Sequence, residues 1–219
     1  GADRIIGGNG AGEIDVLYFT DLTVEGVDLD LDLSQAVSNA ETDTISGIEL
    51  YYMSNLDDTL TGSNAADTVY GNNGDDVFKG NGGDDTLFGD GGNDVLHGDA
   101  HNDRLGGGAG ADTLTGGKGA DQFIFSKARQ ADGDTITDFS AGQGDVIALA
   151  EIDARSDRSG DQSFSWIGAE AFTGKAGQLR SWQEAGSTFV AGDTDGDGVA
   201  DFTIGLSGLL DLTASDFLL

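Results

Sequence analysis

The sequence predicts an all-β protein in which short strands stack into a coil and a β-rich segment caps one end. Three observations predict it. The 219 residues include 37 glycines and no proline, 40 residues are acidic against 10 basic ones, and the middle of the chain repeats every nine residues. Without proline, tight turns depend on positive φ at Gly, Asn or Asp. Self-similarity at a short fixed period is typical of proteins built from stacked repeats.

The net charge of −30 is spread along the whole chain. It excludes nucleic acid and anionic membrane surfaces as electrostatic partners and favours cations. There is no cysteine, so disulfides and thiolate metal sites are excluded, although a bound metal can stabilise a secreted protein instead. No apolar run approaches the ~18 residues of a membrane span, and we expect none.

Eight nine-residue units follow one another from Met53, the last ending at Ile124. Their sixth position is always Asp, namely Asp58, Asp67, Asp76, Asp85, Asp94, Asp103, Asp112 and Asp121. Their eighth position is always apolar, namely Leu60, Val69, Phe78, Leu87, Leu96, Leu105, Leu114 and Phe123. A disordered Gly/Asp linker would not keep two positions in phase, so the repeat predicts a fold.

The residue types of the unit predict its shape. Six residues of Gly, Asn and Asp make a turn, and three residues around the apolar one make a short strand with that side chain inward. Two units make one coil, so an Asp stacks on the Asp 18 residues later, about 4.8 Å away. One edge of the coil would carry Asp76, Asp94 and Asp112, and the other edge Asp67, Asp85, Asp103 and Asp121.

Such columns of carboxylates require a counter-charge. Two carboxylates about 5 Å apart repel by roughly 3 kcal/mol at a surface-like dielectric. Carboxylates with turn carbonyls between them form an all-oxygen ligand set, which suits Ca²⁺ better than Zn²⁺. The pattern therefore predicts several bound Ca²⁺ ions.

The units resemble the nonapeptide G-G-x-G-x-D-x-U-x of RTX (repeats-in-toxin) proteins, which residues 107–115, GGAGADTLT, match in full. The resemblance implies a right-handed parallel β-roll, a form of β-helix, with Ca²⁺ between units n and n+2. The stacked Asp would share the ion with carbonyls at positions two and four of the first unit and one and three of the second. Carried over here, those carbonyls belong to Ser63, Ala65, Gly80 and Gly82; Asn72, Gly74, Gly89 and Gly91; Asn81, Gly83, Gly98 and Ala100; Asp90, Gly92, Gly107 and Ala109; and Asp99, His101, Gly116 and Lys118.

Two places depart from the pattern. The first unit has Met53 and Leu56 where Gly is expected, which weakens the match at Asp58. His101 replaces a turn glycine, where a left-handed backbone would be strained although its carbonyl can still bind. His97 and His101 could suggest a transition-metal pair, but one lies at a strand end and the other in a turn, so we favour no such site.

The repeats divide the chain into three regions. Residues 1–52 form an N-terminal flank in which residues 1–15 resemble two degenerate units. Its alternating stretch, residues 27–33, predicts a half-exposed strand, whose acidic face is either a second cation surface or, as we favour, simply solvated. Residues 53–124 are the roll. Residues 125–219 are a β-rich cap with a secretion signal, similar to the segment that follows RTX arrays in serralysin-type C-terminal domains.

In the cap we expect strands at about 134–139, 145–152, 162–168, 178–183, 187–191 and 199–206 that close the end of the roll. Its aromatic residues are expected in its core rather than on a ligand platform. They are Phe164, Trp166, Phe172, Trp182 and Phe189.

The loop at residues 193–201, DTDGDGVAD, is a second candidate metal site. Asp193, Asp195, Asp197 and Asp201 occupy EF-hand positions one, three, five and nine, but position twelve is Ile204 where a bidentate Glu is needed. The loop is therefore not an EF-hand, and either a different calcium turn or a plain acidic turn remains open.

Two functions fit the sequence. The first is a calcium-binding RTX module that folds on binding Ca²⁺ outside the cell and serves type I secretion and stabilisation of a larger exported protein. The final residues, LTASDFLL, resemble an uncleaved type I secretion signal, so the type I secretion machinery is an expected partner, together with an upstream catalytic or adhesive domain.

The alternative is a polysaccharide-binding or adhesin module, for which the outward positions Tyr70, Lys79, Phe88 and His97 are candidates. We do not expect an enzyme, because the sequence has no HExxH, no G-x-S-x-G and no Cys nucleophile. A catalytic domain upstream is compatible with either function.

Overall fold

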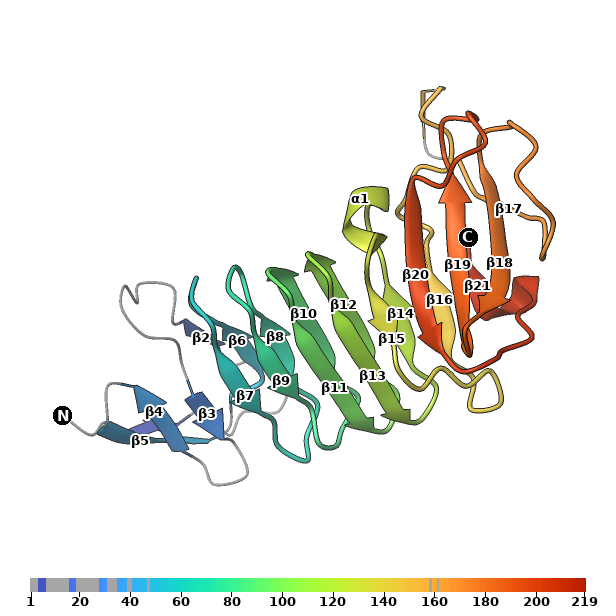
Figure 1. The fold of residues 1–219 in the computed structure, drawn as a ribbon. Helices are drawn as coiled ribbons and strands as arrows, with labels where there is room; N and C mark the ends of the chain where they lie inside the picture. The colour runs from blue at the N-terminus through green and yellow to red at the C-terminus, as the bar shows by residue number, and fades with distance from the viewer. Residues whose placement is uncertain are drawn as a thin grey trace.

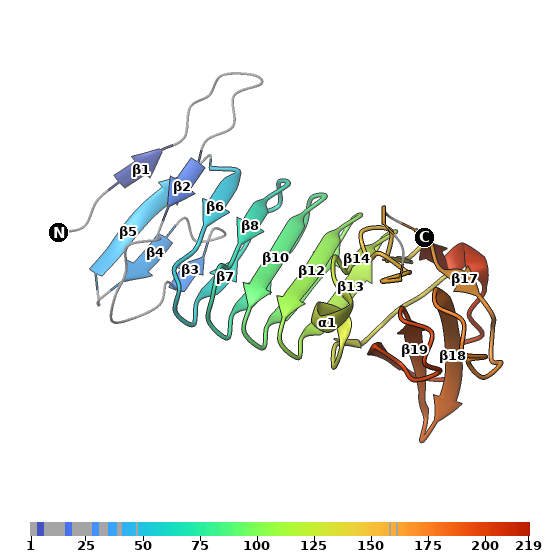
Figure 2. The same ribbon diagram turned by 90° about the horizontal axis from the view of Figure 1, so that it is seen from above.

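The computed structural model describes residues 4–6, 16–18, 28–30, 35–38, 41–46, 48–157, 159–160 and 162–219. The molecule is an elongated stack of strands with the N-terminal strands at one end and the cap at the other (Figure 1). Seen from above, successive strands of the roll cross the stack side by side, like the turns of a coil (Figure 2).

Two sheets, here called sheet A and sheet B, contain the described strands. Sheet A has the strand order β1-β5-β4-β3-β7-β9-β11-β13-β15-β20-β19-β18-β17, and sheet B has the order β2-β6-β8-β10-β12-β14-β16-β21. In sheet A the bounds are β1 Arg4–Ile6, β3 Asp28–Asp30, β4 Gln35–Ser38, β5 Glu41–Ser46, β7 Thr59–Thr61, β9 Val77–Lys79, β11 Val95–Ala100, β13 Thr113–Lys118, β15 Thr135–Ile136, β17 Ser165–Trp166, β18 Gln178–Glu184, β19 Ser187–Asp193 and β20 Phe202–Ser207. In sheet B they are β2 Val16–Tyr18, β6 Leu50–Tyr52, β8 Thr68–Tyr70, β10 Thr86–Gly91, β12 Arg104–Ala109, β14 Gln122–Ile124, β16 Val146–Ala148 and β21 Phe217–Leu218.

Consecutive units of the roll alternate between the two sheets, and each strand pairs in parallel with the strand 18 residues away. Leu87 pairs with Leu105, and Leu96 pairs with Leu114. The two-unit coil and the parallel β-roll expected from the period are therefore confirmed.

The core of the roll is a single file of apolar side chains between the sheets. The eighth residue of every unit, from Leu60 to Phe123, is at most 1 % exposed. On β9 the residues on either side of it, Val77 and Lys79, are exposed. This narrow core buries one apolar side chain per nine residues, so other interactions must hold the turns.

The cap is built differently, from antiparallel pairs β18–β19 and β19–β20. Each of the six strands expected in the cap is present, although β15 and β17 have only two residues each. A short helix α1 (Ala128–Ala131) and a 3₁₀ turn η1 (Ala214–Asp216) were not expected.

The aromatic side chains of the cap are only partly in its core. Phe164 is 5 % exposed, and Trp166 packs on the core while remaining half-buried. Phe172, Trp182 and Phe189 are also half-buried, and the expectation that they lie in the core was wrong for them. These rings pack around a cation and on one another instead. The guanidinium of Arg180 lies 5.7 Å from the Phe172 ring and 5.1 Å from the Trp182 ring, and Phe189 stacks on Trp182 with ring centroids 5.3 Å apart.

The N-terminal flank continues both sheets. β3 pairs in parallel with β7, and β2 pairs in parallel with β6. The alternating stretch contains β3, while most of residues 1–15 lie outside the described residues, apart from β1. Of the flank side chains, those of Tyr18 and of residues 48–52 are described. In the described part of the chain, no helix has the length and apolarity needed to cross a membrane.

Candidate metal-binding columns

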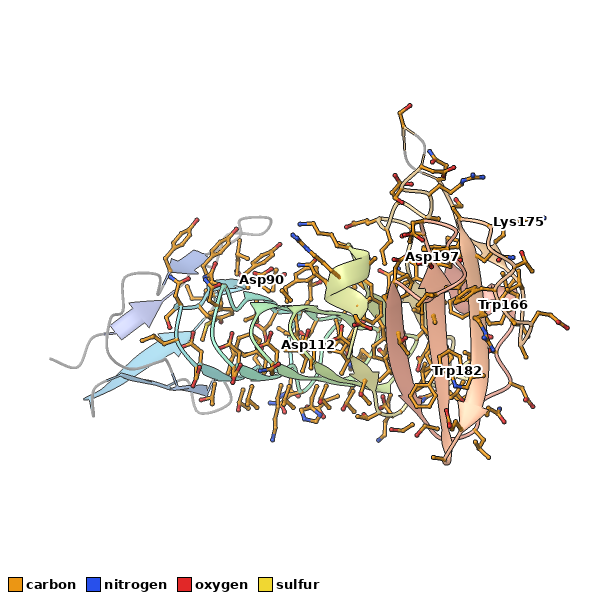
Figure 3. The ribbon with its side chains drawn as sticks, turned by 45° about the horizontal axis from the view of Figure 1, so that its top comes forward. Asp90, Asp112, Trp166, Lys175, Trp182 and Asp197 are labelled. Atoms are coloured by element: carbon orange, nitrogen blue, oxygen red, sulfur yellow. The ribbon has the colours of Figure 1, made fainter. Side chains whose placement is uncertain are left out.

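The repeat aspartates form two buried columns, one along each edge of the roll. In the first column, Oδ1 of Asp94 accepts the backbone N–H of Asp76, and Oδ1 of Asp112 accepts that of Asp94, both at 2.8 Å. In the second column, Oδ1 of Asp103 accepts the N–H of Asp85 at 2.8 Å. Each aspartate therefore stacks on the one 18 residues away, as the period predicted. Asp112 lies inside the roll, between the two sheets (Figure 3).

The second oxygen of these carboxylates, Oδ2, is buried and has no hydrogen-bond partner among the described residues. Seven aspartates share this state: Asp76, Asp85, Asp94, Asp103, Asp112, Asp121 and Asp134. A buried carboxylate oxygen without a partner destabilises the fold, because it has lost its hydrogen bonds to water and has formed none within the protein. Seven in two regular columns mark places where a cation fits.

The glycine at position one of each unit makes room for that oxygen. A Cβ on Gly71 would contact Oδ2 of Asp76, and a Cβ on Gly89 would contact Oδ2 of Asp94. The carbonyl oxygen of Gly89 lies 2.5 Å from the same point beside Gly71, so a carboxylate and a carbonyl converge there. Glycine is therefore needed for space at this position, not for an unusual φ.

The turn carbonyls expected as ligands lie between neighbouring coils. The carbonyl of Asp90 at position two faces Gly108, and that of Gly74 at position four faces Gly92. The position-three carbonyls of Gly91, Ala109 and Lys118 each accept a backbone N–H from the preceding coil, at 2.9, 2.9 and 2.7 Å. Of the carbonyls that the resemblance named, those at position one converge with a column carboxylate, as Gly98 does with Asp85 beside Gly80. The full ligand set stays a prediction.

Positive φ supports these turns at positions two and four. Position two has Asn72, Asn81, Asp90 and Asp99 at φ between 67° and 72°. Asn and Asp tolerate this left-handed region better than other side chains. His101 adopts φ 85° at position four, and its carbonyl still faces Gly119 in the next coil.

Burial raises the pKa of the column carboxyls far above their ordinary value. It brings the pKa of Asp76 and Asp85 to about 8, against the opposing hydrogen bonds from the Asp58 and Asp67 N–H groups. The pKa of Asp94 is raised to about 7 for the same reason, with the charge of Asp112 adding to the effect. Without a counter-ion, the columns therefore favour protons, and a divalent cation would have to displace them.

The ends of the columns differ from their interior. The backbone N–H and hydroxyl of Ser54 donate to Oδ2 of Asp58 at 2.8 and 2.9 Å. Ser63 does the same for Asp67 at 2.9 and 3.2 Å. Burial still raises the pKa of Asp67, but the Ser63 bonds oppose the shift. The carboxylates of Asp58 and Asp67 already have donors, which fits the weak match to the repeat at Asp58.

Two column residues were missed by the sequence analysis. Oδ1 of Asp134 accepts the N–H of Asp112 at 2.8 Å, and Oδ1 of Asp145 accepts that of Asp121 at 3.0 Å. These residues lie 22 and 24 positions after their partners rather than 18, so they fall outside the period. The signal that could have found them is local: Asp134-Thr-Ile and Asp145-Val-Ile keep an acid two residues before an apolar side chain.

The two histidines do not form a pair. Nδ1 of His101 lies 3.2 Å from the N–H of Gly83, which donates to it from the neighbouring coil. His97 is an outward residue of β11, which pairs with Lys79 and Thr115. Among the described residues, the only group of three or more His, Cys, Asp or Glu side chains that could hold a metal lies in the cap.

That cluster consists of Asp193, Asp195 and Asp197, whose carboxylate oxygens lie within 4.8 Å of one another. Asp193 is buried and accepts the N–H groups of Gly196 and Gly198 at 2.6 and 3.0 Å. Asp201 is turned to Thr194, whose N–H and hydroxyl both donate to it at 2.6 Å. The structure gathers three of the four residues, and a metal in this loop stays a prediction.

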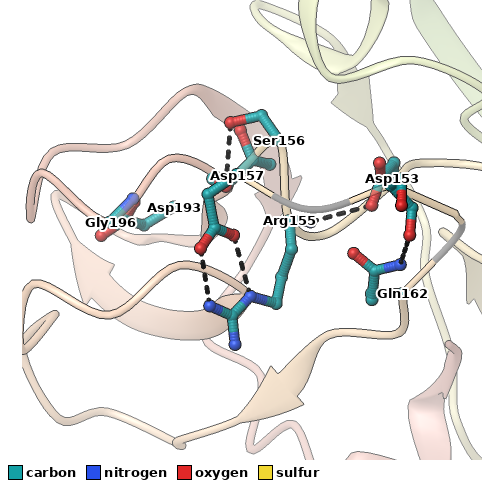
Figure 4. A network of polar contacts seen from close by, with 9 residues as sticks. Asp153, Arg155, Ser156, Asp157, Gln162, Asp193 and Gly196 are labelled. Atoms are coloured by element: carbon teal, nitrogen blue, oxygen red, sulfur yellow. Dashed lines mark hydrogen bonds and ion pairs between the residues drawn. The ribbon is translucent and has the colours of Figure 1, made fainter.

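Arg155, which lines a cavity together with Asp195 and Gly196, is already paired. Nε and a terminal nitrogen of Arg155 donate to Asp157 at 3.0 and 2.9 Å, close to Asp193 and Gly196 (Figure 4). Both side chains are partly exposed, at 30 and 47 %. Such a surface pair adds little to stability.

One protein-family model matches the repeats. The model of the RTX calcium-binding nonapeptide repeat (4 copies) matches residues 54–87, 79–114 and 97–125. The matched stretches span both aspartate columns from Asp58 to Asp121.

Similar solved structures include two solution structures from the Azotobacter vinelandii mannuronan C5-epimerase. The AlgE6R3 subunit is 25 % identical, with 75 % of this chain and 78 % of that chain covered and a TM-score of 0.37. The AlgE6R2 subunit is 26 % identical, with 76 % and 90 % covered and a TM-score of 0.41. No curated protein matches the chain significantly.

Proposed function

Since residues 54–125 are RTX calcium-binding nonapeptide repeats, we propose that this protein is a calcium-gated folding module of a larger exported protein. The observation that carries the proposal is the set of seven buried Oδ2 atoms without partners. Their positions between coils suit a hard divalent ion with flexible oxygen coordination, which describes Ca²⁺.

The residues that would hold each ion follow from the columns. One ion would lie between Asp76 and Asp94, with the carbonyls of Asn72, Gly74, Gly89 and Gly91. The site between Asp85 and Asp103 would be built in the same way. Asp134 would extend the first column by one more site beyond Asp112, because its Oδ2 is also without a partner.

Folding then depends on calcium through linkage. Without an ion, the carboxylates must be protonated or remain buried and charged. The single row of apolar side chains in the core buries too little surface to offset the free-energy cost of these buried charges. An ion that binds only the folded roll stabilises it by mass action. Extracellular calcium modules work at about 10⁻⁴–10⁻³ M, so the chain would stay unfolded inside a cell and fold outside it.

An unfolded acidic chain can thread through a channel. We therefore propose the type I secretion machinery as a partner and the outside of the cell as the destination. The resemblance of the repeats and of the cap to exported RTX proteins supports this step. The folded roll would then stabilise whatever domain is attached to it.

A calcium titration followed by far-UV circular dichroism tests the proposal. We expect little strand signal in chelator at neutral pH and a cooperative rise at about 10⁻⁴–10⁻³ M Ca²⁺, with a much weaker response to Mg²⁺, which demands a tighter octahedral site. A strand-rich spectrum in chelator at neutral pH, or equal folding by Mg²⁺, would contradict it.

A further inference from the structure

A row of aromatic side chains runs along the outer face of sheet B. Tyr18, Tyr52, Tyr70 and Phe88 are register partners on β2, β6, β8 and β10. Their ring centroids are 4.8, 5.1 and 5.5 Å apart, and successive ring planes differ by 3°, 11° and 17°. Parallel strands about 4.8 Å apart place such rings at stacking distance. We call these four residues the aromatic ladder.

The ladder stops at Phe88 because the next register position is Gly106 on β12. The ring of Phe88 leans over this glycine: a Cβ on Gly106 would lie 2.7 Å from Cδ1 and 2.9 Å from Cε1 of the ring. One face of Phe88 is covered by Tyr70, and the other face is turned toward a position without a side chain. Ile124, on the following strand β14, stands beyond this gap.

The gap opens into a cavity of about 230 Å³. Phe88, Ile124 and Gly106 form its apolar part, and Asp90, Lys127 and Gln130 form a polar rim. Asp90 and Lys127 are exposed, so the cavity is open to solvent. Asp90 lies on the side of the roll that faces α1 (Figure 3), and the segment that contains α1 supplies Lys127 and Gln130.

We propose that this cavity binds one pyranose ring of a neutral glycan. A sugar ring has a face of C–H groups that fits against the free face of an aromatic ring, whose π-cloud is negative. Its hydroxyl groups point outward from the ring edge, where Asp90 can accept hydrogen bonds and Lys127 and Gln130 can donate them. Apolar walls with a few polar groups at the rim are typical of small-ligand sites.

Charge decides the class of glycan. The protein carries a net charge of −30, and Lys127 is the only cation on the rim, opposite Asp90. A polyanionic glycan would be repelled, while a neutral one carries no such penalty. A purely aromatic ligand would cover Phe88 but would leave the polar rim unused.

The ladder gives the chain of a glycan a path away from the cavity. It runs along the stack of sheet B strands, from Phe88 to Tyr18, which is 64 % exposed. Sugar units that follow the bound ring would pass over ring edges and tyrosine side chains. A polymer is therefore the better occupant than a free monosaccharide.

The proposal is tested by NMR on the ¹⁵N-labelled protein at saturating Ca²⁺, after circular dichroism has shown that the roll is folded. The probes are hexamers of neutral sugars with gluco, xylo, manno and N-acetylglucosamine units. A polyuronate and a tyrosine-containing tripeptide serve as comparators. We expect at least one neutral hexamer to shift the amide signals of Gly106 and Gly108 in a saturable way.

Three variants test whether binding depends on the Phe88 ring and on the glycine beside it. Phe88→Ala removes the ring face and should weaken binding about tenfold or more. Gly106→Val keeps Phe88 but places a side chain where the ring now leans, so the ring must move and its outer face is covered. This variant should abolish binding. His97→Ala removes a ring from the equivalent strand position on the opposite sheet and should leave binding within about twofold.

The proposal is overturned if no neutral hexamer shifts these amides. It is equally overturned if Phe88→Ala binds as well as the parent protein, or if only the polyuronate or the tripeptide binds. Because every sample is first shown to be folded, failure here would leave the calcium-gated folding untouched.

Discussion

The interior and the ends of the aspartate columns use the same residue in two different ways. Asp94 in the interior has one oxygen bonded to the backbone of Asp76 and one oxygen without a partner. Asp67 at the end has its Oδ2 bonded to both the N–H and the hydroxyl of Ser63. The position of an aspartate in the repeat therefore determines where its carboxylate lies. The hydrogen-bond donors around that carboxylate determine whether it needs a cation.

The C-terminal ends of the two columns differ in the same respect. Oδ2 of Asp145 accepts the N–H of Ser140 at 2.9 Å, while Asp134 in the other column has no such donor. A column that ends on a satisfied carboxylate does not expose a half-built ion site at its last coil.

Asp94→Asn should produce the largest effect, because Asp94 would serve two ions, one with Asp76 and one with Asp112. The amide keeps the acceptor for the Asp76 N–H but loses the charge. In Ca²⁺ we expect about 3–5 kcal/mol lower stability, the scale for breaking a buried ionic contact. In chelator the variant should be more stable than the parent, because a buried charge is gone. Thermal melts in both buffers measure this reversal.

Asp58→Asn is the matched control, since Ser54 already donates to Asp58. It should change stability by no more than about 1 kcal/mol and should leave the number of bound Ca²⁺ ions unchanged by isothermal titration calorimetry. An equal calcium defect in both variants would remove the distinction between interior and end.

Gly89→Ala should have the next largest effect. The new Cβ would overlap the carboxylate of Asp94, with Cβ of that residue only 2.8 Å away. We expect about 1–3 kcal/mol of destabilisation from overpacking, together with weaker Ca²⁺ binding in calorimetry. Gly142→Ala is the control, because its nearest neighbour is the Ser140 hydroxyl at 3.8 Å, and it should be close to neutral.

Acid should partly replace calcium. Burial raises the pKa of Asp76 and Asp134 from 3.8 to about 8, so the folded state binds protons more tightly than the unfolded one. In chelator, stability should therefore increase as pH falls from about 8 toward 4 and be lost again as pH rises through 8. Circular dichroism in chelator across this range checks the sign, and a roll that unfolds further on acidification would contradict it.

Calcium affinity should show the opposite trend, because protons compete for the same oxygens. Calorimetry at pH 8 and pH 6 should give a weaker Kd at pH 6 with protons released on binding. A Kd independent of pH would indicate that Ca²⁺ binds the exposed acids instead of the columns.

Ser63→Ala should have the smallest effect. It removes the hydroxyl bond to Asp67 but keeps the N–H bond, so we expect about 1 kcal/mol of destabilisation in chemical denaturation. Ser140→Ala is the control, because Ser140 reaches Asp145 through its backbone N–H, which alanine keeps. A larger loss in Ser140→Ala than in Ser63→Ala would mean that the hydroxyl of Ser63 does not matter.

The period alone predicted the arrangement of the interior columns. A spacing of nine residues with an acid and an apolar side chain in phase requires Asp76 to stack on Asp94 and Leu96 to lie in the core, because only two units complete a coil. Where insertions lengthen the turns, as before Asp134 and Asp145, the same stacking occurs without the period, and the sequence pattern fails to show it.

The satisfied ends could not be predicted in the same way. A serine at position two reads as an ordinary turn residue, and only the structure shows that Ser63 donates to Asp67. The uncovered face of Phe88 could not be predicted from the sequence either. It depends on strand register, which places Gly106 opposite Phe88. Outward-facing residues do not contribute to the hydrophobic periodicity of the sequence. Which side chains they contact is therefore known only from the fold.

Anomalous diffraction from crystals grown in Ca²⁺ tests the central claim most directly, because it locates each ion. We expect peaks between Asp76 and Asp94, Asp85 and Asp103, Asp94 and Asp112, Asp103 and Asp121, and Asp112 and Asp134, with Ca²⁺ at about 2.3–2.6 Å from the carboxylate oxygens. We expect no ion held by Asp58 against Ser54. Columns without anomalous peaks, or calcium found only at exposed acids such as Asp195 and Asp197, would contradict it.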